Sequence, residues 1–133
     1  QRSITIRPNG IRQLKTKGAQ RTLPLSPRSL ELLQGHRRGK GDRHALFPDY
    51  ARPRGRDAAS AMMMKRLRRS ITDKKLTMHS LRHRIKDKLR NTGCPEAISL
   101  AILGHSTNTV AANYGSGYAL EVMREHMEKG WVE

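Results

Sequence analysis

Residues 79–105 read HSLRHRIKDKLRNTGCPEAISLAILGH, and this stretch predicts two consecutive helices. In the first, about residues 79–92, apolar residues recur every four positions and share one face, and Gly93 ends the helix. They are Leu81, Ile85 and Leu89. The second, Pro95–Leu103, is almost continuously apolar and is closed by Gly104. This pair predicts the centre of a helical core.

The regions on either side of this pair are also expected to be mainly helical. Ser106 or Thr107 is expected to cap a helix that ends near Tyr114. A last helix over about Tyr118–Lys129 would carry a stripe of three apolar residues, Leu120, Met123 and Met127. Upstream, Asp57 is expected to cap a helix over Ala58–Arg69, and its core candidates are Met62, Met63 and Leu67.

The first part of the chain differs, because it alternates polar and apolar residues. Two or three short strands are expected over residues 3–7, 10–15 and 21–25, separated by turn residues. Ser26 and Pro27 then start a helix that Gly35 would end, with a buried face of Leu30, Leu32 and Leu33. Residues 36–56 are expected to form a long basic loop. The predicted fold class is α+β and mainly α: a small antiparallel sheet followed by a helical bundle.

Composition narrows the classes of partner. The chain has 133 residues and a formal net charge of +16, which points to a polyanion such as nucleic acid. Its apolar runs are too short to cross a bilayer. A single cysteine, Cys94, excludes an internal disulfide framework and indicates a reducing, cytoplasmic location. A ribosomal protein, a histone-like protein and a DNA enzyme all fit these values.

The first motif of chemical interest is His79-Ser80-Leu81-Arg82-His83. His79 and Arg82 lie three residues apart on one helix face, so both side chains can reach one phosphate. Alone, the pair is more often part of a solvated basic surface. His79 and His83 have the spacing of zinc ligands, but the residue after His79 is serine rather than glutamate and no third ligand is evident. We therefore expect no metal site.

The second motif is Leu103-Gly104-His105, followed by Tyr114. Gly104 allows a sharp turn, so His105 is expected at a junction between two helices. The hydroxyl of a tyrosine has an ordinary pKa near ~10 and needs cationic neighbours before it attacks well. Alone, such a tyrosine is more often a core residue with one hydrogen bond. Tyr118 is a second candidate nucleophile.

Together, in this order and spacing, His79-x-x-Arg82, Leu103-Gly104-His105 and Tyr114 resemble the catalytic block of the tyrosine recombinase (phage integrase) family. Lys15-Thr16-Lys17 followed by Arg21-Thr22-Leu23-Pro24-Leu25 is similar to the lysine-bearing hairpin of that family. The resemblance covers nearly the whole chain. It implies a site-specific DNA recombinase in a bacterial nucleoid or a phage-infected cell.

The resemblance also implies a role for each residue. Tyr114 would attack a DNA phosphodiester to give a 3′-phosphotyrosyl link, and Arg82 would bind the non-bridging oxygens. His79 would act as general base or donor near Tyr114, and His105 would donate to the same phosphate. Lys15, with Lys17 as the alternative, would protonate the departing 5′-oxygen. The reaction would use neither a metal nor another cofactor. By its spacing, Tyr114 is favoured over Tyr118.

The chain departs from the family pattern in one respect. The family has a further catalytic arginine, in a helix upstream of the hairpin. Arg2, Arg7 and Arg12 do not lie in that context. We therefore expect residues 1–133 to be one N-terminally truncated catalytic domain, which would be inactive or nearly so in isolation.

The resemblance further implies double-stranded DNA as partner and a tetramer of protomers on it, with exchange of the C-terminal segment Tyr118–Glu133. The apolar stripe of that segment would then pack against another protomer. The alternative is a basic DNA-binding module that keeps the fold but not the reaction. Its contacts would come from the loop at 36–56 and the cluster at 65–69.

Overall fold

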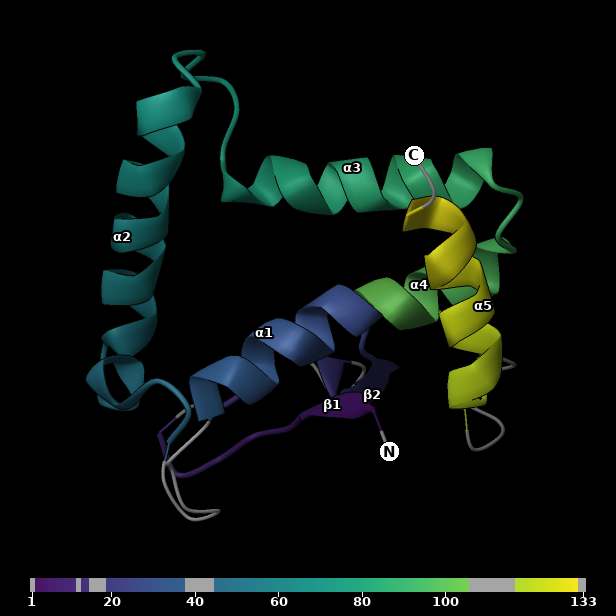
Figure 1. Cartoon of the computed structure of the whole chain (residues 1–133), viewed down its shortest axis with the longest axis horizontal. Coiled ribbons are helices and arrows are strands. Elements are labelled where there is room, and N and C mark those ends of the chain that lie inside the picture. Colours follow the sequence, from purple (N-terminus) through teal and green to yellow (C-terminus); the bar gives the residue numbers. More distant parts are fainter. Residues whose placement is uncertain (1, 12, 15–18, 38–44, 106–116, 132–133) are drawn as a thin grey trace.

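The computed structural model describes residues 2–11, 13–14, 19–37, 45–105 and 117–131. Its elements in chain order are β1 (Ser3–Ile6), β2 (Arg21–Pro24), α1 (Pro27–Arg37), η2 (Pro48–Tyr50), α2 (Gly55–Ser70), α3 (Met78–Asn91), α4 (Glu96–Leu103) and α5 (Leu120–Trp131). Figure 1 shows α2 and α5 at opposite ends of the molecule, with the small sheet between their lower ends. The predicted fold class, mainly α with a small antiparallel sheet, is confirmed.

In the described part of the chain, the sheet has two antiparallel strands. Ser3 of β1 lies opposite Pro24 of β2, and Ile6 lies opposite Arg21. The strand expected over residues 10–15 is not formed in the described residues of that segment. There the side-chain oxygen of Asn9 accepts a hydrogen bond from the backbone N–H of Ile11 at 2.9 Å, so the chain turns instead of extending.

The core lies where α3, α4 and α5 meet, and β2 packs against α5. Its buried residues come from three helices and one interhelical junction: Leu89, Cys94, Ile98, Ile102 and Met123. The expected stripe on α3 is only partly buried, since Leu89 is 2% exposed and Leu81 is 47% exposed. Both predicted helix ends are confirmed, because Gly93 and Gly104 adopt left-handed backbone conformations just after α3 and α4.

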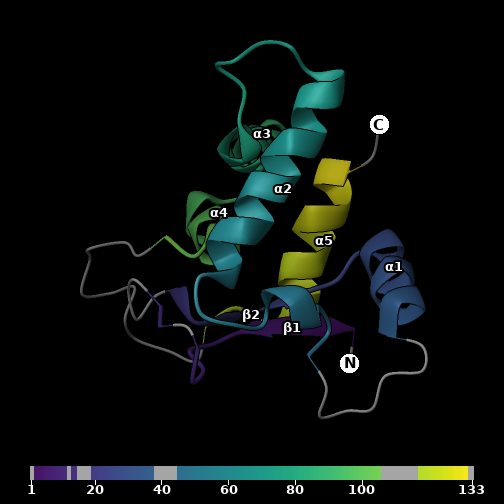
Figure 2. The same ribbon diagram turned by 90° about the vertical axis from the view of Figure 1, so that its left-hand side faces the viewer.

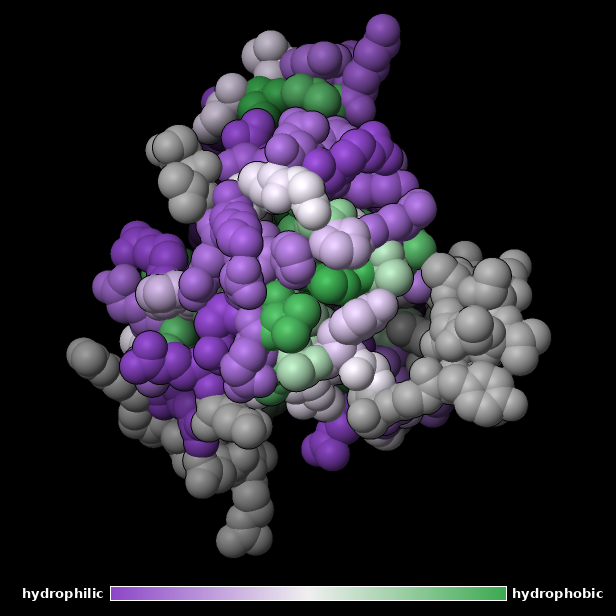
Figure 3. Space-filling model, turned by 90° about the vertical axis from the view of Figure 1, so that its right-hand side faces the viewer, coloured by the Kyte–Doolittle hydropathy of each residue, from purple (hydrophilic) through white to green (hydrophobic). Residues whose placement is uncertain are grey.

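The last helix, α5, packs on its own chain. Met123 is buried in the core, and Leu120 and Met127 are half-buried against it. This counts against the expectation that the stripe packs on another protomer, because α3 and β2 of the same chain already offer it an apolar surface. On the face nearest α5, apolar residues gather in a central patch bordered largely by hydrophilic side chains, and a second apolar group lies at the top of the view (Figure 3).

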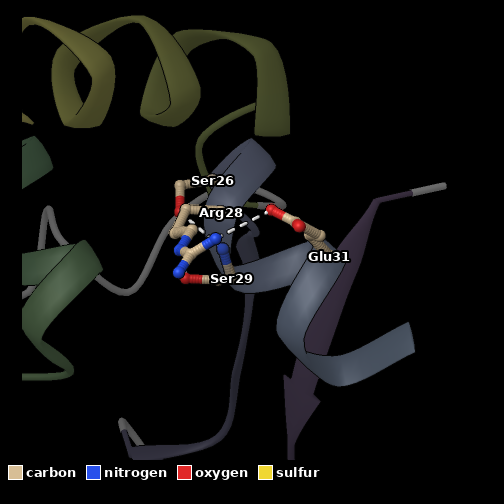
Figure 4. A network of polar contacts seen from close by, with 4 residues as sticks. All are labelled: Ser26, Arg28, Ser29 and Glu31. Atoms are coloured by element: carbon tan, nitrogen blue, oxygen red, sulfur yellow. Dashed lines mark hydrogen bonds and ion pairs between the residues drawn. The ribbon is translucent and has the colours of Figure 1, made fainter. Parts of the chain in front are cut away.

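The helices α1 and α2 bury little. In Figure 2, α1 lies on the side of the molecule away from α3 and α4. The predicted start of α1 is confirmed: Ser26 Oγ accepts from the backbone N–H of Ser29 at 3.1 Å, next to an ion pair between Arg28 and Glu31 (Figure 4). However, Leu32 is 59% exposed rather than buried.

Two predicted helix boundaries are wrong. α1 continues past Gly35 to Arg37, because a glycine inside a helix costs only about 1 kcal/mol and does not oblige the helix to end. α2 begins at Gly55 rather than after Asp57: Arg54 occupies the cap position in a left-handed conformation, and Asp57 falls in the first turn. Within the described residues, no helix has both the length and the hydropathy needed to cross a membrane.

Candidate functional site

The start of α3 is fixed by two sets of hydrogen bonds. Thr77 caps the helix: its hydroxyl accepts from the backbone N–H of His79 at 3.2 Å, and the Ser80 hydroxyl accepts from the N–H of Thr77 at 3.0 Å. Just upstream, the Arg68 guanidinium donates to the carbonyl oxygens of Asp73 at 2.8 Å and Leu76 at 2.7 Å. These contacts set where α3 begins, and therefore where His79 and Arg82 lie.

Arg82 projects from α3 onto the C-terminal end of α4. Its Nη2 donates a hydrogen bond to the carbonyl oxygen of Leu103. The last carbonyls of a helix have no partner within the helix and carry partial negative charge, so a guanidinium is favoured there. A guanidinium has five N–H donors, and this contact engages one of them.

A second arginine, Arg21 of β2, reaches the same helix end. Its Nε donates to the carbonyl oxygen of Ile102 at 3.1 Å, and its Nη1 donates to the carbonyl of Ala19 at 2.9 Å. The sequence pattern did not identify Arg21 as a site residue. Its contact with α4 spans 81 positions of the chain, and no local motif signals such a contact.

Gly104 and His105 directly follow the last residue of α4. Gly104 has φ 66° and ends α4, and the backbone N–H of His105 then donates to the carbonyl of Leu100 at 2.9 Å. A β-carbon at Gly104 would overlap Nη1 of Arg21. Glycine therefore serves two needs here: the left-handed turn, and the close approach of Arg21 to the backbone.

The electrostatics show that these groups act on one another. Slight desolvation of the exposed ring, and then the positive charges of Arg82, Lys86, Arg21 and His79, lower the pKa of His105. Burial and then Arg82 likewise lower the pKa of Arg21. We call these five residues the basic cluster. Among the described residues, no ion pair joins a carboxylate to Arg21 or Arg82, so the cluster has an uncompensated positive field that an anion would relieve.

The structure describes three of the predicted site residues. His79, Arg82 and His105 belong to the basic cluster, and the rings of His79 and His83 meet edge to face with centroids 4.9 Å apart. Tyr114, Lys15 and Lys17 lie outside the described residues. The alternative nucleophile, Tyr118, is exposed just before α5.

A pocket of about 240 Å³ adjoins Arg21 and Arg82. Apart from these two and Lys88, its lining is apolar and comes from β2, α3, α4 and α5. The Lys88 ammonium lies 5.6 Å from the centre of the Trp131 ring, at the end of α5. The aliphatic stems of the two arginines can therefore lie against the core while their charged ends meet the α4 carbonyls.

A search of curated proteins and a search of solved structures returned no match. The profile of the phage integrase family, by contrast, matches residues 1–121, which include both motifs, the basic cluster and Tyr114. Because the match covers most of the chain, this protein belongs to the phage integrase family, the tyrosine recombinases.

Proposed function

We propose that this chain cuts and rejoins double-stranded DNA through a 3′-phosphotyrosyl intermediate. The observation that carries the proposal is that the guanidinium of Arg82 binds the carbonyl of Leu103, two residues before His105, while the charges of Arg82 and His79 act on His105. An arginine and two histidines near one helix end suit a phosphodiester, whose non-bridging oxygens gain negative charge as the phosphorus is attacked.

The step balances as a transesterification. The Tyr114 oxygen forms a bond to phosphorus, the bond from phosphorus to the 5′-oxygen breaks, and Lys15 or Lys17 protonates that oxygen. His79 accepts the tyrosine proton, while Arg82 and His105 donate to the non-bridging oxygens. The new bond keeps the energy of the old one, so the reverse attack by a 5′-hydroxyl rejoins the strand. The residues named supply the nucleophile, the proton transfers and part of the phosphate binding without a cofactor, and the further arginine of the family pattern would complete the site.

The test is covalent capture on a nicked suicide substrate, from which the 5′-hydroxyl fragment diffuses away. In the full-length protein, Tyr114→Phe is expected to abolish the protein–DNA adduct. Tyr118→Phe is the matched control and is expected to retain it. Adduct formation by Tyr114→Phe would contradict the assignment, and loss of adduct in Tyr118→Phe alone would transfer the nucleophile's role to Tyr118.

A second candidate function, DNA binding without the reaction, is favoured by α2. Among its residues only Gly55 is buried, and its last turns expose Lys65, Arg66 and Arg69 to solvent. Such a surface suits sequence-independent contact with phosphates. If this function is the whole of the activity, wild type will retard duplex DNA with a steep salt dependence but form no adduct at any salt concentration.

We further propose that protomers assemble on DNA as a tetramer. Exchange of the segment Tyr118–Glu133 would require α5 to leave α3 and β2, which bury Met123. The contacts therefore favour an assembly that keeps α5 on its own chain. Crosslinking on DNA between cysteines placed in α5 and α3 distinguishes the two, because exchange gives bonds between chains.

A further inference from the structure

Arg21 contacts the candidate site but has no role in the reaction proposed above. We propose that Arg21 is a positioning residue: by holding the C-terminal end of α4 against β2, it keeps His105 beside Arg82. This inference rests on the proposed function, since it concerns the same phosphate site.

The first argument is that Arg21 and Arg82 bind consecutive carbonyls, those of Ile102 and Leu103. The last carbonyls of a helix point in a common direction, so the two guanidinium groups are brought together at one helix end. Burial of Arg21 and its repulsion by the charge of Arg82 both disfavour its charged form, as the lowered pKa of Arg21 indicates. The two residues are thus held close by their contacts with α4 and not by attraction for each other.

The second argument is that Arg21 is held at two points. One N–H binds Ala19 of its own chain segment, and another binds Ile102 of α4. Arg21 therefore links its own strand, β2, to the C-terminal end of α4. His105 lies only three residues after Ile102, and its backbone N–H already binds within α4. Moving the end of α4 would consequently move His105.

The third argument comes from Gly104. Any side chain there would overlap the Arg21 guanidinium, which is the end of a flexible side chain, so Arg21 would be displaced in addition to the strain that the positive φ causes. Gly93 has a similar left-handed φ, 74° against 66°, but a β-carbon there would meet nothing within 4 Å. The two glycines therefore separate backbone strain from loss of the Arg21 contact.

The main test compares Arg21→Gln and Arg21→Lys in the full-length protein, with the exposed Arg7→Gln as control. Loss of a charged hydrogen-bond donor predicts adduct formation about tenfold slower or more for Arg21→Gln. Arg21→Lys keeps the charge but not the two directed N–H groups, so we expect an intermediate rate. Affinity for DNA should change less than the rate in both variants. Adduct rates within about twofold of wild type in both variants would overturn the proposal.

Two further readouts do not depend on catalysis. Amide exchange at Gly104 and His105 should accelerate in both Arg21 variants and not in Arg7→Gln. The pKa of His105 should rise in Arg21→Gln, because one of the cations facing it is lost while Arg82, Lys86 and His79 remain. It should stay low in Arg21→Lys. Unchanged exchange at the end of α4 in both Arg21 variants would overturn the positioning role.

Gly104→Ala and Gly93→Ala give an independent check in which Arg21 itself is intact. Only Gly104→Ala should slow adduct formation and speed exchange at His105, and equal effects of the two changes would overturn the inference. If wild type forms no adduct, the proposed reaction fails, and the exchange and pKa measurements still decide whether Arg21 holds the end of α4.

Discussion

The molecule has two regions that differ in burial: one packs its side chains into a core, and the other exposes most of them to solvent. The packed region comprises β2, α3, α4 and α5, and α4 alone buries Ile98, Ser99, Ile102 and Leu103. The outer region comprises α1, η2 and α2, whose only buried residue is Gly55. Every member of the basic cluster lies in the packed region or directly after it. A site that must place several donors around one phosphate needs a fixed framework, whereas contact with a charged backbone needs only exposed cations.

The largest expected effect tests this contrast directly. Leu89→Ala removes a side chain that is 2% exposed at the centre of the core, so we expect the free energy of unfolding to fall by about 2–5 kcal/mol. Leu32→Ala in α1 removes a side chain that is 59% exposed and should change it by less than about 0.5 kcal/mol. Urea denaturation followed by circular dichroism measures both. Equal losses would show that α1 is as firmly packed as α3.

The sequence predicts the packed region well because several local signals agree there. In α3, the apolar spacing of four residues and the position of Gly93 both give the helix that is observed, within one residue at each end. In α4, the apolar run and Gly104 do the same. Burial of these residues then reinforces the local preference.

The outer region is predicted less well, because nothing there reinforces a weak local preference. Gly35 and Asp57 each predict a helix boundary, but the helices run through both. The spacing of leucines in α1 correctly predicts a helix, but its prediction that Leu32 is buried is wrong. Periodicity reports which residues share a face, and only the tertiary contacts decide whether that face is covered.

For the candidate site, the sequence motifs draw attention to three of the residues in the basic cluster but not to Arg21. His79, Arg82 and His105 are recognisable from order and spacing. Arg21 is not, because its partners are backbone carbonyls, which carry no sequence signature. Gly104 was expected as a helix end, and its second role, leaving space for the Arg21 guanidinium, depends on the same long-range contact.

A smaller effect is expected at the junction of the two regions, where Arg68 of α2 holds the segment leading to α3. Its guanidinium donates to several carbonyls, including those of Asp73 and Leu76, so Arg68→Ala should cost about 1–3 kcal/mol of unfolding free energy. The neighbouring Arg69 is exposed, and Arg69→Ala should cost less than about 0.5 kcal/mol.

The Arg68→Ala and Arg69→Ala variants also show whether a change in the outer region alters the start of α3, where His79 lies. Amide exchange at His79 and Ser80 should accelerate in Arg68→Ala and remain unchanged in Arg69→Ala, because Arg68 donates to carbonyls of the segment before the Thr77 cap and Arg69 is exposed. Unchanged exchange in both variants would mean that the Thr77 cap alone sets the start of α3, and that the outer region could move without disturbing His79.

The smallest effect concerns the exposed face of α5. Although α5 belongs to the packed region, substitutions on this face should change stability as little as those in the outer region. Lys129 Nζ lies 2.6 Å from Glu125 Oε1, and this hydrogen bond, followed by the charge of Lys129, lowers the pKa of Glu125. The unfolded chain therefore has the higher pKa. The pair contributes stability above that value, and the contribution is lost as the pH falls through the folded pKa.

Lys129→Met should accordingly raise the pKa of Glu125 towards its ordinary value, as measured by NMR titration of the side-chain carboxyl. Arg28→Met, which breaks the exposed pair with Glu31 in α1, is the control and should leave Glu125 unchanged. The midpoint of urea unfolding should hardly move in either variant, because both pairs are open to solvent and screened by salt. A clear loss of stability in Lys129→Met alone would show that the exposed face of α5 also helps to hold the helix on α3. The ion pair would then contribute to stability as the buried residues of the packed region do.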